Sequence, residues 1–463
     1  MNAWVPRITV HSLFIVVSVL TYVLTTRVEH ERRPPSIAIA WVLGLIAVPY
    51  LVLPMYLMFG RRKVLRKISP WSGVRSQGKH WAEDLIESFG LAASAPVTVS
   101  LHQDGHESAA SLFTTMSSAS ERLDICTYIL GNDAFGQEAT QHMIEQAQRG
   151  VKVRLLIDGV GAMQLPPLRF RQLEAGGIET AIFSPLLARK TQGPRNLRNH
   201  RKMAIADGTR LWAGGRNIAA EYFTGLNGAP PWRDLSFELQ GGVAGAAATQ
   251  FEADWVAAGG KPAARIVVPR VAAAPSIGTP VAAPIAGRAQ FLPSGPDQTE
   301  DTVHALLIDA CCHSRERMLA VTPYFVPDVS LETAMRLAAR RGVKIDLVIP
   351  SASNHRLADF ARNRALRALS DAGVGIHLLP YMIHAKAVVF DDSLALSGSV
   401  NLDSRSLLLN YECAVVFFGA REIDWLAKWV RALIPESRPF DCRAPGLWRD
   451  IAEGLLLAVA YQL

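Results

Sequence analysis

Two copies of one residue pattern place histidine, lysine, aspartate and asparagine side chains at fixed spacing in this chain. The pattern is His-x-Lys-x4-Asp followed by Gly-(Gly/Ser)-x-Asn. The first copy consists of His200, Lys202, Asp207, Gly214, Gly215 and Asn217, and the second of His384, Lys386, Asp391, Gly398, Ser399 and Asn401. Each residue of the second copy lies 184 positions after its counterpart. A single match could arise by chance, whereas two with the same internal spacing indicate a duplicated functional unit.

These residue types suit exchange at a phosphodiester, whose negative charge repels nucleophiles. Lys202 and Lys386 would neutralise the non-bridging oxygens, and amides such as that of Asn217 would donate further hydrogen bonds to them. One neutral imidazole would attack phosphorus, while a second, protonated imidazole would donate to the departing oxygen. Two histidines in different protonation states are therefore needed, and the duplication supplies them. This chemistry requires no metal ion and no other cofactor.

The surroundings of the two copies predict an α/β fold that is itself duplicated. Each half shows a strand, a helix and a second strand in succession, which is typical of layered α/β domains. The matching segments are 122–130 and 317–324, then 149–157 and 341–349, and finally the short apolar runs 203–206 and 387–390. The last pair would be buried strands that present His and Lys on the face toward a cleft.

The doubled pattern resembles the phospholipase D superfamily, in which two His-Lys-Asp motifs meet in one active site. Further stretches are similar to bacterial cardiolipin synthases, namely residues 32–36 with 40–41, 198–202, 231–234, 293–297, 322–328 and 401–406. The resemblance covers nearly the whole chain. Gly215 departs from the serine that many superfamily members carry, which places more weight on Ser399.

The resemblance implies transfer of a phosphatidyl group from one phosphatidylglycerol to another, with release of glycerol and a phosphohistidine intermediate. It implies His200 as the nucleophile and His384 as the general acid, and it makes Asn217, Ser399 and Asn401 candidate substrate-binding residues. Another membrane-bound phospholipase D-type phosphodiesterase or transphosphatidylase is the alternative. A non-catalytic binding module is a further one, against which the two intact motifs argue.

Each imidazole needs an acceptor that fixes its Nδ1 proton, so that the Nε2 lone pair is free. Asp207 and Asp391 belong to the motif and are counted with its histidines and lysines as the catalytic residues that the resemblance implies. As partners of the imidazoles they are less suitable, because each follows a short strand and is better placed to hold a turn. Asp234 and Glu412 are the better candidates for orienting the histidines. In related enzymes such acids pair across the two halves, which implies Glu412 with His200 and Asp234 with His384.

The amino-terminal part of the chain is predicted to be a membrane anchor of two transmembrane helices. Residues 8–26 and 36–60 form uncharged runs of 19 and 25 residues, and about 20 apolar residues span a bilayer as a helix. A cleaved signal peptide is the alternative for the first run, although a second run so close favours a hairpin. The positive-inside rule applied to the basic residues at 61–67 predicts a multi-pass protein of the bacterial inner membrane with a cytoplasmic catalytic body.

The predicted organisation is therefore an anchor at 1–68, a first phospholipase D-like half at 69–258, an Ala/Pro-rich connection at 259–290 and a second half at 291–463. The formal net charge of +7 favours anionic partners, and with the lipid resemblance we expect anionic membrane lipids and no nucleic acid.

The five cysteines show neither metal-ligand nor disulfide spacing. A helix after residue 446 has Trp448, Ile451, Leu455, Leu456 and Val459 roughly on one face. It is expected to pack on the core, with membrane contact as the alternative. The oligomeric state stays open.

Overall fold

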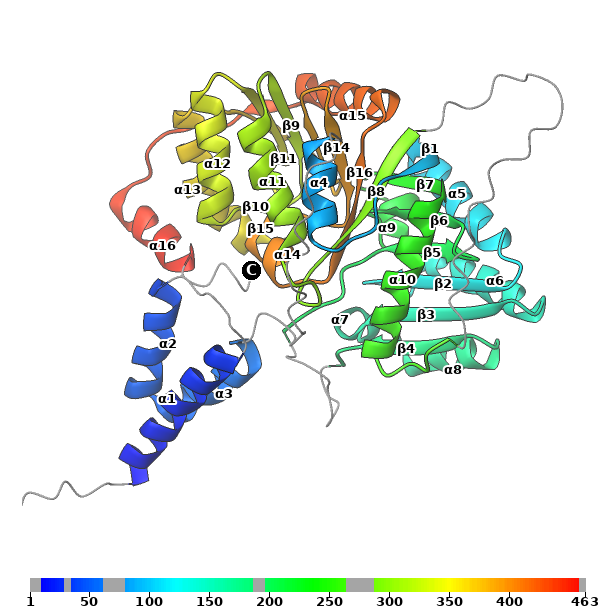
Figure 1. Ribbon diagram of the computed structural model, residues 1–463, viewed down its shortest axis with the longest axis horizontal. Helices are drawn as coiled ribbons and strands as arrows, with labels where there is room; N and C mark the ends of the chain where they lie inside the picture. The colour runs from blue at the N-terminus through cyan, green and yellow to red at the C-terminus, as the bar shows by residue number, and fades with distance from the viewer. Residues whose placement is uncertain (1–9, 29–34, 61–79, 186–195, 264–286, 458–463) are drawn as a thin grey trace, which may run out of the picture.

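The computed structural model describes residues 10–28, 35–60, 80–185, 196–263 and 287–457. Its centre is one 15-stranded sheet in the order β17-β12-β11-β9-β13-β14-β16-β8-β1-β7-β6-β5-β2-β3-β4. Outward from the antiparallel β1–β8 pair, each half repeats the same series, because β7, β6, β5, β2, β3 and β4 correspond to β16, β14, β13, β9, β11 and β12 (Figure 1). The predicted duplicated α/β architecture is present.

Within the described residues, the first half contributes seven strands to this sheet and contains six helices after α4. Its strands are β1 (Ala95–His102), β2 (Arg122–Thr127), β3 (Lys152–Asp158), β4 (Glu179–Phe183), β5 (Met203–Ala206), β6 (Arg210–Gly214) and β7 (Ser236–Gly241). Its helices are α5 (Gly105–Ser117), α6 (Ala134–Gln148), α7 (Gly159–Ala162), α8 (Pro167–Ala175), α9 (Ala220–Phe223) and α10 (Gly242–Ala257), preceded by α4 (Trp81–Ser88), which packs on the second half.

The second half repeats this arrangement and adds a carboxy-terminal extension. Its strands in the large sheet are β8 (Gly287–Ser294), β9 (Arg317–Val321), β11 (Lys344–Pro350), β12 (Gly375–Leu379), β13 (Ala387–Phe390), β14 (Leu394–Gly398), β16 (Glu412–Phe417) and β17 (Arg438–Pro439), and β10 (Phe325–Val326) pairs with β15 (Leu402–Asp403). Its helices are α11 (Thr302–His313), α12 (Val329–Arg340), α13 (Arg356–Asp371), α14 (Ser404–Leu408), α15 (Ala420–Leu433), the 3₁₀ turn Ile434–Glu436 and α16 (Leu447–Leu457).

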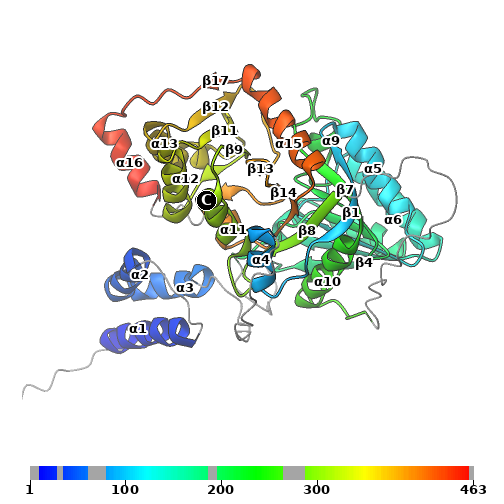
Figure 2. The ribbon, with the colours of Figure 1, turned by 45° about the horizontal axis from the view of Figure 1, so that its top comes forward.

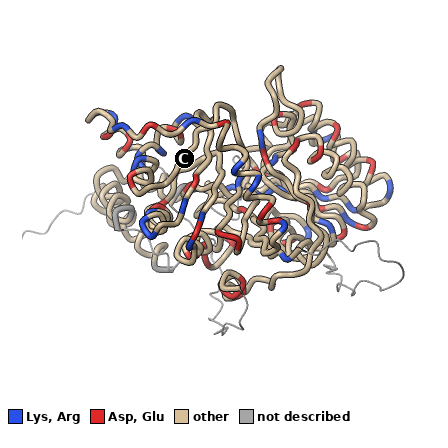
Figure 3. The backbone as a smooth tube through the Cα atoms, turned by 90° about the horizontal axis from the view of Figure 1, so that it is seen from above, with Lys and Arg blue, Asp and Glu red and all other residues tan. Residues whose placement is uncertain are grey.

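The sheet is buried on both faces, which explains why its motif strands read as continuous apolar runs. In β5, Met203 and Ile205 enter a core shared by both halves under α10 and α15, while Ala204 and Ala206 face the core under α5 and α6. Helices α11, α12 and α13 cover the second half on the side opposite α15 (Figure 2). Charged residues of both signs are interspersed over this α/β body (Figure 3).

Aspartate caps begin several helices at the ends of strands. Asp104, Asp133, Asp328 and Asp403 accept backbone N–H groups in the first turns of α5, α6, α12 and α14. These caps satisfy donors that a helix leaves unpaired at its start. Strand β8 begins at Gly287, within the connection predicted at 259–290, and residues 264–286 of that connection lie outside the described residues.

The amino-terminal region differs from the predicted hairpin. It contains α1 (Val10–Val28), α2 (Pro35–Ala47) and α3 (Pro49–Phe59). Residues 36–60 are thus not one helix, because Pro49 lacks the N–H that a continuing helix would need and instead starts α3. Within the described ranges, no helix has both the length and the apolar character to cross a bilayer. The basic residues at 61–67 lie outside these ranges.

Candidate active site

Both His-Lys motifs lie at the start of equivalent strands, and each is joined to the other half by a short backbone pairing. Asn199 forms an isolated parallel bridge with Tyr411, and Arg233 forms one with Ile383. The N–H of His200 donates to Tyr411 O at 2.8 Å, and that of His384 donates to Arg233 O at 2.6 Å. In the first bridge, the next residues are His200 on one segment and Glu412 on the other. In the second bridge, they are His384 and Asp234. The backbone therefore sets each histidine beside an acid of the opposite half.

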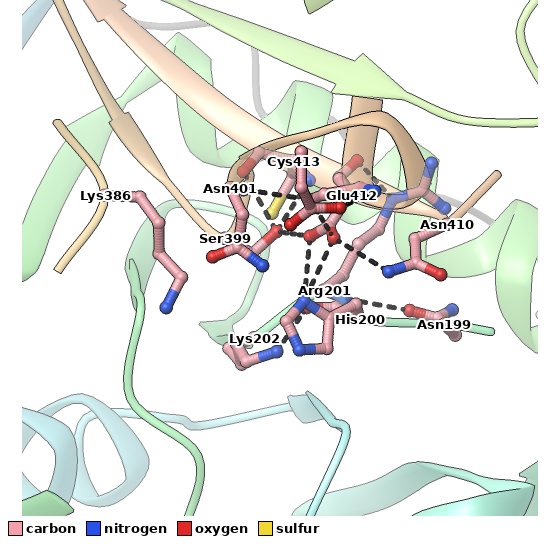
Figure 4. A network of polar contacts seen from close by, with 12 residues as sticks. Asn199, His200, Arg201, Lys202, Lys386, Ser399, Asn401, Asn410, Glu412 and Cys413 are labelled. Carbon is pink, nitrogen blue, oxygen red and sulfur yellow. Dashed lines mark hydrogen bonds and ion pairs between the residues drawn. The ribbon is translucent and has the colours of Figure 1, made fainter. Parts of the chain in front are cut away.

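His200 contacts Glu412 as the cross-pairing predicts (Figure 4). Its Nδ1 lies 3.0 and 3.2 Å from the two carboxylate oxygens. Ser399, Ser406 and Asn410 donate to the same carboxylate at 2.5, 2.7 and 3.3 Å. Burial alone would raise the pKa of Glu412, but the contacts of His200, Lys202 and Ser399 hold it below its ordinary value. Glu412 is therefore an ionised acceptor that fixes the imidazole.

His384 makes the reciprocal contact, with its Nδ1 2.7 Å from Asp234 Oδ2. Burial would raise the pKa of Asp234, but His384, Lys386 and Arg216 lower it below its ordinary value. Gly215 lies directly against this carboxyl, and a Cβ at that position would be 2.2 Å from Asp234 Oδ1. The absence of a serine at 215 is thus a steric requirement of Asp234, and the hydroxyl of Ser399 has no counterpart here.

The two histidines and two lysines lie in one buried cluster. Burial lowers the pKa of His200 to about 4, where Lys202 and Lys386 act in the same direction and Glu412 opposes them. Burial, followed by Lys386, lowers the pKa of His384 to about 3, against the pull of Asp234. Burial also lowers the pKa of Lys202 to about 8 and that of Lys386 to about 7. Cations concentrated in this way favour an anion between them.

The lysine heads have different neighbours. Lys202 Nζ donates to His200 O at 2.6 Å. Lys386 Nζ donates to His384 O and lies 2.9 and 3.0 Å from the two ring nitrogens of His384. Both ammonium groups are thus held at their own histidine, and within the described residues neither lies at ion-pair distance from a carboxylate.

The candidate substrate-binding residues differ in the hydrogen bonds that their side chains make within the protein. Asn217 Oδ1 accepts from the N–H of Ile129 at 3.3 Å, and its Nδ2 donates to Tyr222 at 2.9 Å. Ser399 Oγ donates to Glu412 and accepts from the N–H of Cys413 at 3.0 Å. Asn401 Oδ1, by contrast, is buried without a hydrogen-bond partner in the described part of the chain.

Asp207 and Asp391 lie at the far ends of β5 and β13 and hold the loops that enter the neighbouring strands. Asp207 accepts the N–H groups of Ser120, Glu121 and Arg122 at 2.8 to 2.9 Å. Asp391 accepts those of residues 315, 316 and 317 at 2.8 to 3.0 Å. Both acids adopt a positive φ, which suits a turn residue. Their contacts agree with the expectation that they hold turns and do not orient the histidines.

An aromatic wall around the imidazoles was not predicted as part of the site. Tyr128 lies edge-on to His200 with ring centroids 5.0 Å apart, and Tyr222 lies edge-on to His384 at 5.0 Å. Trp232 and Tyr324 lie 5.8 and 6.5 Å from His384. Tyr128 directly follows the last residue of β2, and Tyr324 lies three residues after the end of the equivalent strand β9. A tyrosine shortly after each of these strands was the available sequence signal.

Buried arginines connect the halves behind the motifs. Arg201 is fully buried, donates to Glu412 O at 2.9 Å and pairs with Asp254 and Asp297, which belong to different halves. Arg233 pairs with Glu436 at 2.8 Å and stacks on Tyr381. These contacts make Arg233 a brace between the halves.

Arg405 of the second half likewise reaches the first half and donates to Asn196 O at 2.9 Å. Within the described ranges, no three His, Cys, Asp or Glu side chains are grouped so as to hold a metal ion.

Comparisons with known proteins agree with this geometry. The chain matches the family model "Cardiolipin synthase, PLD-like domain" over residues 112–228 and 307–434, and "Phospholipase_D-nuclease N-terminal" over residues 12–61. It is 30% identical to "Cardiolipin synthase A" of Pseudomonas aeruginosa (strain LESB58) over 460 residues, covering 92% of this chain and 91% of that protein. It is 29% identical to "Major cardiolipin synthase ClsA" of Bacillus subtilis (strain 168) over 435 residues, covering 87% of each.

Among solved structures, the fold is similar to that of phosphatidylserine synthase from Haemophilus influenzae Rd KW20. The TM-score is 0.61 at 14% identity, covering 82% of this chain and 99% of that one. At this identity the likeness concerns the fold alone. The family match over more than half of the chain and the 30% identity to cardiolipin synthase A show that the chain belongs to the bacterial cardiolipin synthases of the phospholipase D superfamily.

Proposed function

We propose that the chain forms cardiolipin by transferring a phosphatidyl group between two phosphatidylglycerol molecules, with release of glycerol. The family to which it belongs supports phosphatidyl transfer. The observation that carries the residue roles is the pair of imidazoles, each hydrogen-bonded through Nδ1 to a carboxylate of the opposite half.

In the first step, His200 is the nucleophile. Because its Nδ1–H is donated to Glu412, the lone pair of Nε2 is free to attack phosphorus. The bond between phosphorus and the glycerol oxygen breaks, and His384 supplies the proton that completes the glycerol hydroxyl. Phosphorus is then bonded to His200 Nε2. The side chain of His200 is 13% exposed and that of His384 4%, which favours His200 as the more accessible nucleophile.

In the second step, the free hydroxyl of another phosphatidylglycerol attacks the phosphohistidine. His384, now neutral, accepts the hydroxyl proton, and the bond between phosphorus and His200 breaks. Both histidines return to their starting states, so the cycle needs no cofactor.

The substrate itself would set the protonation states that this cycle needs. Burial keeps the pKa of His384 near 3, so this imidazole is neutral at pH 7 before substrate binds. A phosphodiester adds negative charge beside Lys202 and Lys386 and, with Asp234, favours the imidazolium. The lysines and the amide of Asn401 would hold the non-bridging oxygens as charge builds on them.

We further propose that α1, α2 and α3 are embedded in the bacterial inner membrane and that the α/β body is cytoplasmic. Large apolar side chains are exposed on all three helices, including Val10, Leu13, Leu20, Leu24, Ile39, Leu43, Leu51 and Leu57. Such a surface is typical of contact with lipid. The hydroxyls of Ser18, Thr21 and Thr25 donate to carbonyls four residues earlier, so they need no water. The orientation rests on the basic residues at 61–67.

The decisive experiment supplies the purified chain with phosphatidylglycerol alone and identifies the products by mass spectrometry. We expect cardiolipin and glycerol in equal amounts, and no product from a His200→Ala variant. Phosphatidic acid with glycerol and no cardiolipin would instead identify a hydrolase.

A second experiment tests the roles of the histidines. A substrate with a nitrophenol leaving group needs no acid, so His384→Asn should accumulate a phosphorylated His200. A label on another residue would contradict the assignment.

A further inference from the structure

Helix α16 packs on the body through its polar face. Glu453 is fully buried and pairs with Arg367 of α13, while Arg449 donates to the same carboxylate at 3.0 Å. Asp450 lies 3.9 Å from Arg367. The apolar part of this contact comes from Leu456, which packs against a small buried cluster of Val326, Ala358 and Ala361. The helix lies on the outside of the second half (Figure 1).

The opposite face of α16 is apolar and exposed. Leu447 is 71% exposed, Trp448 82% and Ile451 44%. The expectation that the apolar stripe would pack on the core is therefore wrong for Trp448 and Ile451, whereas Leu456 does pack on the body. A surface helix normally buries its apolar face and exposes its charges. Burying a carboxylate is unfavourable unless it is paired, and here Glu453 is buried while a tryptophan is not. Docking on α13 thus turns the apolar face outward.

We propose that this outward face of α16 (Leu447, Trp448 and Ile451) inserts into the surface of the lipid bilayer and holds the catalytic body against it. The inference rests on the proposed lipid substrate, because a soluble body must reach phosphates at the membrane surface. An amphipathic helix with tryptophan and a neighbouring basic residue, here Arg449, is typical of interfacial binding.

The position of α16 relative to the catalytic cluster supports this role. Leu456 of α16 packs against the cluster that contains Val326. Tyr324, two residues before Val326, lies 6.5 Å from His384 between ring centroids. Leu357 in the first turn of α13 is 59% exposed. The helix therefore adjoins the strand that leads into the site, and a bilayer bound there would be next to the aromatic wall.

A second copy of the chain is the less suitable occupant. A standard protein interface buries about 800 Å² on each partner and involves about 20 to 30 residues a side. The outward face of α16 offers three large side chains on an 11-residue helix. Lipid needs no such matching surface, since a few inserted side chains suffice to hold an already membrane-bound chain.

The test measures the fluorescence of Trp448 in the full chain reconstituted in nanodiscs of phosphatidylglycerol with or without brominated acyl chains. The chain has 10 tryptophans, so the signal of Trp448 is the difference between wild type and Trp448→Phe. Bromine should quench this difference signal severalfold. The difference signal obtained with Trp425→Phe, on α15 along the upper edge of the body and away from α16, should not change (Figure 1). An unquenched Trp448 that acrylamide reaches overturns the proposal. An unquenched Trp448 that acrylamide does not reach identifies a protein occupant instead and equally overturns it.

A second measurement uses activity at varying mole fractions of phosphatidylglycerol in mixed micelles. Leu447→Glu with Ile451→Glu should raise the apparent KM for surface lipid severalfold and leave kcat unchanged. Leu337→Glu on α12, where the leucine is 57% exposed, is the matched control and should change neither value. If the double variant has a wild-type KM, the helix does not serve the reaction at the surface. Because quenching is independent of turnover, an inactive chain with a quenched Trp448 would refute the proposed reaction and not the membrane contact.

Discussion

Replacement of Glu412 by glutamine tests the cross-paired site most directly. Glu412 is buried in the second half and bonds His200 of the first half, so the change removes one charge and almost no volume. Its two oxygens accept from His200, Ser399, Ser406 and Asn410. Whichever oxygen becomes an amide nitrogen, at least one of these donors loses its acceptor. The glutamine therefore cannot hold the imidazole as the carboxylate does.

The expected loss follows from the role of the carboxylate. In a serine-protease triad, loss of the carboxylate that fixes the tautomer lowers kcat by about 10⁴. The amide oxygen of glutamine still accepts one hydrogen bond from Nδ1, so we expect a loss of at least about 10³ in kcat, or about 4 kcal/mol of barrier. KM should change little, because Glu412 contacts Nδ1 of His200 and not the Nε2 that would meet the phosphate.

The assay is steady-state formation of cardiolipin, together with the size of the phosphohistidine burst. Glu436→Gln is the matched control, because Glu436 is an exposed acid that pairs with Arg233 and Tyr381 outside the cluster. Thermal unfolding should show that both variants fold. A Glu412→Gln enzyme within tenfold of wild-type kcat would refute the claim that this carboxylate fixes His200.

Three further predictions follow from the same contacts. Gly215→Ser should lower kcat at least about a hundredfold, because a Cβ at 215 would lie 2.2 Å from Asp234. Ser399→Ala should lower kcat by a smaller factor, and equal losses would contradict this steric argument. Activity should survive incubation with EDTA, and a loss restored by a divalent ion would overturn the metal-free cycle. Burial raises the pKa of Asp403 to about 6, above its unfolded value of 3.8, so its stabilising contribution is present below pH 3.8 and is lost as pH rises through 6. Asp403→Asn should therefore gain stability relative to wild type between pH 4 and 7, by at most about 3 kcal/mol, and a Tm difference that is independent of pH would contradict it.

The sequence predicted the parts of the site that depend on residue type and repetition. The 184-residue offset indicated the duplication, and strands β5 and β13 follow the motif lysines as expected. The pairing of Glu412 with His200 was predicted from resemblance, since nothing local in either segment indicates the other. Its physical cause is the Asn199–Tyr411 bridge, a long-range backbone contact that no periodicity reveals.

Predictions based on hydropathy alone were less accurate. An uncharged run of 25 residues indicated one helix, but Pro49 divides it into α2 and α3. The apolar stripe of α16 indicated core packing, yet an ion pair between Glu453 and Arg367 decides which face is buried. A hydrophobic stripe shows that a helix has two faces, and only the contacts show which one meets the protein.

The cross-pairing also explains why the duplicated halves must work as one unit. Each half supplies a histidine and lysine together with the acid that orients the other half's histidine, so neither half contains a complete imidazole–carboxylate pair. The β1–β8 pairing at the centre of the sheet and Arg201 behind Glu412 fix the relative position of the halves. The surrounding donors differ, because three side chains besides His200 bond Glu412 while Gly215 leaves Asp234 without a serine. A symmetric fold thus holds two chemically distinct histidines, which is the condition for one to attack phosphorus while the other transfers the proton.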